Sequence, residues 1–293
     1  SCQNEPAETI ENREGLIALN RTELFVKVIG KGEPIVFVHG GPGLDHTYFL
    51  PQMANFAQDH TLIFYDQRLG GKSATDLDST QISLDTFLGD IEAIRKHFGL
   101  GKMNLLGHSW GGLLAMFYAL EYPNSLNKLI LSGASPASSA LRASEGAKIA
   151  MRFTKQDSID RAEILASEDF QNGKADAYEK FFRLMYKKEF VNEIKAEQLT
   201  LDFPENFVQN SRKLGYLGKD VAQYDLHEDL KKVETPTLII YGDFESGAEA
   251  GAKIHENLPN SEFVLLEECG HFPFVEKPRP YFKAIKQFLS ETE

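Results

Sequence analysis

Short apolar runs alternate with amphipathic segments along most of this chain, and this alternation constrains the fold more than any other feature. The runs lie at residues 35–38, 61–65, 103–106, 128–131, 237–241 and 263–266. They are short and rich in β-branched or large apolar residues, as are parallel strands that are buried on both faces. The pattern therefore predicts an α/β fold with a mostly parallel central sheet flanked by helices.

Other segments fit around this sheet. Residues 16–20 and 24–29 flank a short polar turn and read as an opening hairpin. Helical segments are expected at 82–98, at 113–121 and at 280–289.

Residues 135–234 break the alternation. They carry no strand signal and read as several helices, with apolar spacing that includes Tyr178, Phe182 and Tyr186. The block is too long for a loop, so we expect a helical cap inserted into a core of residues 1–134 and 235–293. The aromatic stripe either packs onto the core or also lines a pocket.

Composition limits the function classes. Of the 293 residues, 42% are hydrophobic and 25% are charged, which excludes a disordered or low-complexity chain. The net charge of −12 repels nucleic acid, and no basic cluster reverses it locally. No apolar run reaches the length of a membrane span.

The two cysteines, Cys2 and Cys269, cannot form a disulfide framework. Cys269 lies in an apolar context and reads as a buried free thiol. Cys2 follows Ser1 at the head of a polar segment, which resembles a bacterial lipoprotein after removal of its signal peptide. The alternative is an incidental cysteine, so a cell-envelope lipoprotein and a cytoplasmic protein both stay open.

Residues 107–111 read Gly-His-Ser-Trp-Gly, a G-x-S-x-G motif. Alone the motif is weakly specific. Here it follows a buried strand and precedes a helix, which is the context of a nucleophile elbow. The glycines permit a tight turn that exposes the Ser109 hydroxyl, and the helix N-terminus favours developing negative charge. Ser109 is therefore the expected nucleophile.

Residues 39–43 read His-Gly-Gly-Pro-Gly directly after a predicted strand, a far more specific string. Glycines let backbone amides turn inward and form an oxyanion hole. The expected donors are the amides of Gly41 and Trp110. His39, inside this loop, is expected to hold the loop rather than act as a base.

A serine nucleophile needs a base, and the base needs an acid that orients it. In elbows of this kind the chain order is Ser, acid, His. His271 follows the last predicted strand and is the expected base. The strand at 237–241 runs into Asp243 and Glu245, and both are candidates for the acid.

These motifs resemble the proline iminopeptidase family of α/β hydrolases. The match rests on residues 39–43, on Gly-His-Ser-Trp-Gly-Gly at 107–112 and on Gly-His-Phe-Pro at 270–273. Residues 66–73 are similar to the family's D-Q-R-G-x-G-x-S loop, with Leu69 in place of the first glycine. The resemblance runs from about residue 30 to the C-terminus and is weak only in the cap.

The resemblance implies which residue is the triad acid, but this sequence departs from the family at the positions that bind the substrate amine. The family's acid stands three residues after the strand's glycine, which selects Glu245 over Asp243. Family aminopeptidases hold the substrate amine with acidic residues, one directly after the triad acid and others in the cap. Here Ser246 follows the acid, and the expected cap position falls near Leu214. Glu205 is a tentative substitute for substrate binding.

We therefore expect a serine hydrolase of proline iminopeptidase type with a Ser109–His271–Glu245 triad. It would release an N-terminal proline or small residue from peptides through an acyl-enzyme. A carboxylesterase with the same triad is the main alternative, and a non-catalytic hydrolase-like binding protein is a third. No metal or organic cofactor is implied, and the partner is a small peptide or ester substrate. The oligomeric state does not follow from the sequence.

Overall fold

The structure, a computed structural model, describes residues 10–291, so Cys2, the candidate lipid acceptor, lies outside the described residues. Its centre is an eight-stranded sheet with the order β1-β2-β4-β3-β5-β6-β7-β8. The strands are β1 (Arg13–Leu19), β2 (Thr22–Gly30), β3 (Glu33–Val38), β4 (His60–Tyr65), β5 (Met103–His108), β6 (Leu126–Ser132), β7 (Thr237–Gly242) and β8 (Ser261–Leu266). β1 and β2 pair antiparallel, and β2 joins antiparallel to β4. The pairs from β4 through β8 are parallel, as the sequence predicts.

The apolar runs form strands whose side chains pack into the hydrophobic core on both faces of the sheet. In β3, Val36 and Val38 belong to one buried cluster, whereas Ile35 and Phe37 belong to the other. Side chains alternate between the faces of a strand. A strand that is covered on both faces therefore needs the continuous apolar run seen here.

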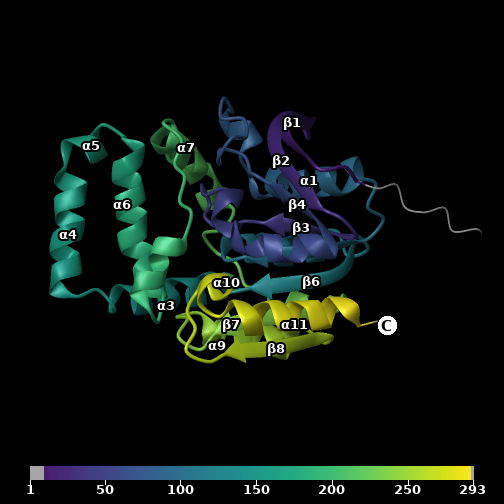
Figure 1. The fold of residues 1–293 in the computed structure, drawn as a ribbon. Helices are drawn as coiled ribbons and strands as arrows, with labels where there is room; N and C mark the ends of the chain where they lie inside the picture. Colours follow the sequence, from purple (N-terminus) through teal and green to yellow (C-terminus); the bar gives the residue numbers. More distant parts are fainter. Residues whose placement is uncertain (1–9, 292–293) are drawn as a thin grey trace, which may run out of the picture.

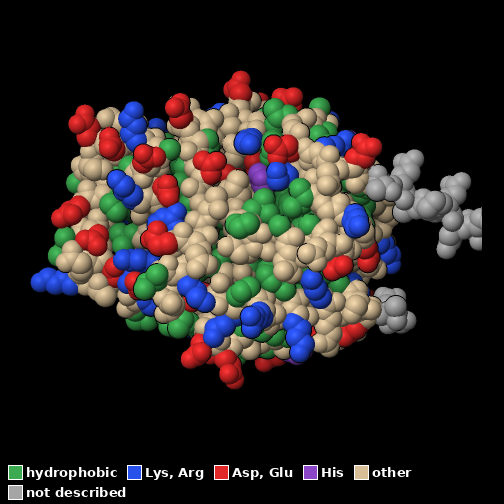
Figure 2. Space-filling view, viewed as in Figure 1, with side chains coloured by type: hydrophobic (Ala, Val, Ile, Leu, Met, Phe, Trp, Pro, Cys, Tyr) green, Lys and Arg blue, Asp and Glu red, His purple; other side chains and the backbone are tan. Residues whose placement is uncertain are grey.

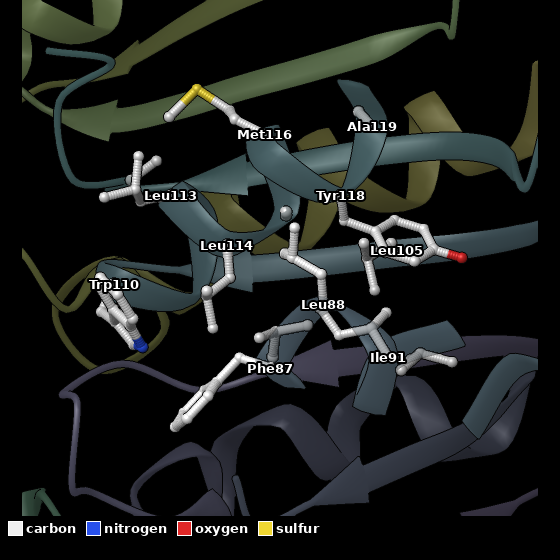
Figure 3. Close-up of a cluster of buried hydrophobic side chains, with 14 of the residues drawn as sticks. Phe87, Leu88, Ile91, Leu105, Trp110, Leu113, Leu114, Met116, Tyr118 and Ala119 are labelled. Carbon is white, nitrogen blue, oxygen red and sulfur yellow. The ribbon is translucent and has the colours of Figure 1, made fainter. Parts of the chain in front are cut away.

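The helices of the core cover both faces of the sheet. They are α1 (Leu84–His97), α2 (Trp110–Glu121), α9 (Ala248–Asn257), α10 (Pro273–Glu276) and α11 (Pro278–Ser290), with 3₁₀ turns η1 (His46–Phe49), η2 (Gln52–Gln58) and η3 (Ser79–Gln81). Figure 3 shows side chains of α1, including Phe87 and Ile91, gathered with Leu114 of α2 near Leu105 of β5. This packing fixes α2, and with it the end of β5, on the sheet.

Helices fill the segment between β6 and β7. They are α3 (Ser139–Ala150), α4 (Lys155–Ala166), α5 (Glu168–Gln171), α6 (Ala175–Tyr186), α7 (Phe207–Leu214) and α8 (His227–Leu230), with 3₁₀ turns η4 (Lys187–Glu189), η5 (Glu193–Gln198) and η6 (Gly215–Lys219). In Figure 1, α4, α5 and α6 project to one side of the sheet. The predicted aromatic stripe does both things expected of it: Tyr186 packs edge-on against Phe272 of the core, and it also lines the cavity described below.

The surface and Cys269 give no further indication of function. Within residues 10–291, no helix combines the length and apolarity needed to cross a membrane. Figure 2 shows acidic and basic side chains interspersed over the cap. Cys269 is a buried free thiol, as expected.

Candidate active site

Ser109 lies at the junction of β5 and α2 in a backbone conformation that few residues adopt. Its φ is 57° and its ψ is −123°, which is unusual for a residue with a side chain. A Cβ on Gly107 would lie 2.4 Å from the Gly111 oxygen, and one on Gly111 would lie 2.0 Å from the Val38 oxygen. The glycines of the motif thus allow helix, strand and loop to approach closely, as a nucleophile elbow requires.

The loop after β3 brings Gly41 to the same cavity. Gly41 has a φ of 126°, and a Cβ there would lie 2.7 Å from the Gly43 nitrogen. The neighbouring Gly40 amide donates to the Tyr48 hydroxyl at 2.7 Å. Trp110, the other predicted donor, is the first residue of α2. Amides in the first turn of a helix have no intrahelical partner.

The His39 side chain stabilises the loop after β3 through hydrogen bonds. Its Nε2 accepts a hydrogen bond from the backbone N–H of Gln67 at 2.9 Å, and its Nδ1 lies 2.7 Å from the Gly40 oxygen. Burial lowers the pKa of His39 to about 4, so the ring is neutral. These contacts agree with the supporting role expected from the sequence.

His271 follows β8 and bonds Glu245 from the loop after β7. The His271 Nδ1 and Glu245 Oε2 atoms are 2.8 Å apart, and Glu245 Oε1 accepts from the Gly242 amide at 2.8 Å. Asp243 points elsewhere and accepts from the Cys269 amide at 3.1 Å. The geometry therefore favours Glu245 as the residue that orients the imidazole.

Ser109, His271 and Gly41 line one cavity of about 190 Å³. Within residues 10–291 the structure shows no hydrogen bond between the Ser109 hydroxyl and the His271 ring. Nucleophile–base pairs are often loose before a substrate binds, so a shared cavity is the informative observation. Two acidic residues that sequence reasoning missed, Glu145 and Glu189, line the same cavity.

The two missed carboxylates come from the cap. Glu145 lies in α3, and Glu189 ends η4. A Cβ on Gly247 would lie 2.6 Å from Glu145 Oε1. Glu145 thus reaches the backbone next to Ser246, the position where the family resemblance calls for an acid.

The two cap positions considered from the sequence lie outside this cavity. Glu205 is exposed and is not among the residues that line the cavity. Leu214 is buried, and its side chain would lie 3.2 Å from a Cβ on Gly43. Counting along the sequence did not single out Glu145 or Glu189, because they belong to separate segments of the cap, α3 and η4.

The carboxylates and His271 shift one another's proton affinity. Burial alone would lower the pKa of His271, but the charge of Glu189 and the bond to Glu245 outweigh it and raise that pKa to about 9. Burial raises the pKa of Glu145 to about 7 and also raises that of Glu189. The acids around the cavity thus favour the protonated form of His271.

One group of potential metal ligands occurs among residues 10–291, namely Asp45, His46 and Asp66, whose donor atoms lie within 4.8 Å of one another. His46 Nδ1 and Asp66 Oδ1 are 2.6 Å apart, and Asp45 accepts from the Thr47 amide at 2.8 Å. These bonds within the group fix the chain after the predicted oxyanion loop. We assign the group that structural role and no part in the cavity.

Comparison with known proteins also identifies an α/β hydrolase. The family model for the alpha/beta hydrolase fold matches residues 33–278. The proline iminopeptidase of Heyndrickxia coagulans is 30% identical over 275 residues, which cover 89% of this chain and 92% of that protein. The proline iminopeptidase of Lactobacillus helveticus (strain DPC 4571) is 30% identical over 302 residues, covering 95% and 98%.

Solved structures agree on the fold. An alpha/beta fold family hydrolase from Bacillus anthracis str. Sterne superposes with a TM-score of 0.72 at 22% identity, covering 94% of this chain and 99% of that chain. The proline iminopeptidase of Mycobacterium smegmatis gives a TM-score of 0.69 at 19% identity, covering 94% and 97%. At these identities the likeness establishes the fold class alone, and it confirms the fold expected from the sequence.

Proposed function

This chain belongs to the proline iminopeptidase family of α/β hydrolases, and from that premise we propose that it is a serine aminopeptidase that releases an N-terminal proline or small residue from peptides. The observation that carries the proposal is the presence of Glu145 and Glu189 in the cavity of Ser109 and His271. A buried ammonium without a carboxylate is costly. Two acids beside the nucleophile suit a substrate with a free amine.

The proposed chemistry follows from the positions of the residues. The Ser109 hydroxyl attacks the carbonyl carbon of the first peptide bond while His271 Nε2 takes its proton. Glu245 holds Nδ1–H and stabilises the imidazolium that forms. The amides of Gly41 and Trp110 stabilise the oxyanion, a contribution of about 3–4 kcal/mol for each donor in comparable sites.

The second half of the cycle returns the serine. The imidazolium gives its proton to the departing amine, and an acyl-enzyme remains on Ser109. Water then attacks the ester with His271 as base, and the released amino acid leaves. The size of the cavity, about 190 Å³, suits one small side chain.

The amine recognition is what separates this proposal from a carboxylesterase. The site would bind the ammonium between Glu145 of α3 and Glu189 of η4. A neutral acyl ester would offer neither acid a substrate cation to bind. An esterase would have no use for either carboxylate.

The test compares a prolyl arylamide with a short-chain aryl ester on the same enzyme preparation. Cleavage of the arylamide, with a lower KM than its N-acetylated form, supports the aminopeptidase proposal. Fast ester cleavage without arylamide cleavage overturns it in favour of a carboxylesterase. Absence of turnover on every substrate, with the protein folded, favours the binding-protein alternative.

A further inference from the structure

Two carboxylates face the same nitrogen of His271. Glu245 Oε2 lies 2.8 Å from His271 Nδ1, and Glu189 Oε2 lies 3.9 Å from the same atom. They come from different parts of the chain, the loop after β7 and the η4 turn of the cap. One carboxylate suffices to orient a catalytic imidazole. The second carboxylate, that of Glu189, is therefore not needed to orient the ring and must affect His271 in another way.

Other charged or titratable groups also face this ring. Glu145 adds a third acid from α3. The Arg152 guanidinium after α3 interacts with these acids and adds the opposing charge. His108, at the end of β5, packs against His271 with ring centroids 4.7 Å apart. Burial lowers the pKa of His108 well below its usual range, so it carries no charge. Acids outnumber bases around His271, and the balance favours the imidazolium.

An imidazolium cannot take the proton of a serine. The pKa of His271, raised to about 9, means that the ring is mostly protonated near pH 7 before substrate arrives. Among the charges that raise it, Glu189 is the largest contributor. Whatever neutralises Glu189 therefore frees the base.

On the basis of the proposed function, we propose that Glu189 couples amine recognition to general-base catalysis. In the free enzyme its carboxylate holds His271 as an imidazolium. The substrate's α-ammonium pairs with Glu189, and the imidazolium loses its Nε2 proton to solvent while Nδ1–H stays on Glu245. Nε2 then accepts the Ser109 proton. A substrate without an amine leaves the base protonated, so selectivity arises in the chemical step as well as in binding.

Two phenyl esters test the coupling, that of L-proline and that of cyclopentanecarboxylic acid, which has the same ring without the nitrogen. Each ester is assayed as a function of pH. The pH midpoint of the acid limb of the kcat/KM profile reports the pKa of the base in the free enzyme, and that of the kcat profile reports its pKa in the enzyme–substrate complex. For the proline ester we expect the kcat limb to lie about one pH unit or more below the kcat/KM limb. For the neutral ester the two limbs should coincide. Equal gaps for both esters would overturn the inference.

Glu189→Gln separates charge from structure. The variant keeps the side-chain shape and the backbone oxygen that bonds His271, but it removes the charge. We expect the kcat/KM limb of both esters to move to lower pH, and the neutral ester to react about tenfold faster at pH 7. Glu197→Gln, an exposed acid of the cap with 72% of its side chain accessible, should leave the limb in place. An unmoved limb in Glu189→Gln contradicts the inference.

A measurement without turnover distinguishes this inference from the proposed function. In Ser109→Ala labelled with ¹⁵N-histidine, the midpoint of the His271 titration is followed by NMR with and without L-prolinamide. Saturating ligand should lower that midpoint by about one pH unit or more. Binding that leaves the midpoint unchanged overturns the coupling while leaving the aminopeptidase proposal standing. Absence of prolinamide binding also overturns the coupling, and arylamide cleavage by the wild type then decides the proposed function separately.

Discussion

The backbone N–H of His271 donates to the backbone oxygen of Glu189 at 2.8 Å, which ties the loop after the last strand to the cap. The contact is close because the residue before His271 is a glycine. A Cβ on Gly270 would lie 1.9 Å from that same oxygen. Glu276 joins the same two segments, since its carboxylate accepts from the Gly270 amide of the loop at 2.6 Å and from the Asn192 amide of the cap at 3.0 Å.

Gly270→Ala should therefore separate the cap from the loop of His271. We expect a loss of about 2–4 kcal/mol in the free energy of unfolding, because the new methyl group meets backbone rather than a flexible side chain. Gly146→Ala in α3 is the matched control. A Cβ there meets nothing within 4 Å, so this variant should gain about 0.5–1 kcal/mol. Urea unfolding of both variants checks the difference, and equal stabilities would contradict it.

Ser109→Ala tests the nucleophile. The variant should lose turnover by about 10⁴-fold or more while it keeps the wild-type circular dichroism and Tm. Alanine shares with serine the cost of the φ of 57°, so the elbow itself should persist. Activity retained on all substrates would remove Ser109 from the mechanism.

The acid of the triad is tested by a pair of substitutions. Glu245→Gln should lower kcat/KM on the order of 10³–10⁴-fold, since the amide favours the wrong tautomer of His271. Asp243→Asn should cost far less, because Asp243 bonds the Cys269 amide and not the imidazole. The reverse order of effects would move the role to Asp243.

The nucleophile elbow and the oxyanion loop follow from local rules, which is why the sequence predicts them. Gly107 and Gly111 have to be glycine where strand, helix and loop meet, and such a requirement leaves a recognisable string. The pairing of Glu245 with His271 is also predictable, because both residues follow strands of a parallel sheet. Their side chains therefore meet at the same edge of the sheet.

Glu145 and Glu189 could not be found in that way. They lie on separate helical segments of the cap, 44 positions apart in the sequence, and no local pattern marks either. Only the packing of α3 and η4 over the sheet brings them together. Helix α9 was likewise not predicted, since Gly251, which packs against the Tyr241 ring, interrupts its apolar spacing.

Glu92 makes the stability of the core depend on pH. Its carboxylate accepts from Arg95 Nε at 2.8 Å and from the Tyr118 hydroxyl at 2.7 Å, and the bond to Arg95 lowers its pKa from 4.5 to about 2. Because the folded-state pKa is depressed, the stabilisation is complete above pH 4.5 and is lost as pH falls toward 2. Glu92→Gln should cost about 1.5–3 kcal/mol at pH 7 and clearly less at pH 3.5.

Urea denaturation at the two pH values measures this change. Glu121→Gln, which alters an exposed acid in α2, should show no such pH dependence. A penalty for Glu92→Gln that stays constant from pH 7 to pH 3.5 would show that shape, and not charge, accounts for the contribution of Glu92.

Glu145 should make the affinity for amines depend on pH. Burial raises its pKa to about 7, so the carboxyl is neutral below that pH and cannot attract an ammonium. For a prolyl arylamide, KM of the wild type should fall as pH rises through about 7. Glu145→Gln should raise KM about tenfold at pH 8 and abolish this trend. Glu249→Gln, an exposed acid paired with Lys148, serves as the control and should change neither. A neutral aryl ester separates recognition from general damage: if its KM rises in Glu145→Gln as much as that of the arylamide, Glu145 shapes the cavity and does not bind the amine.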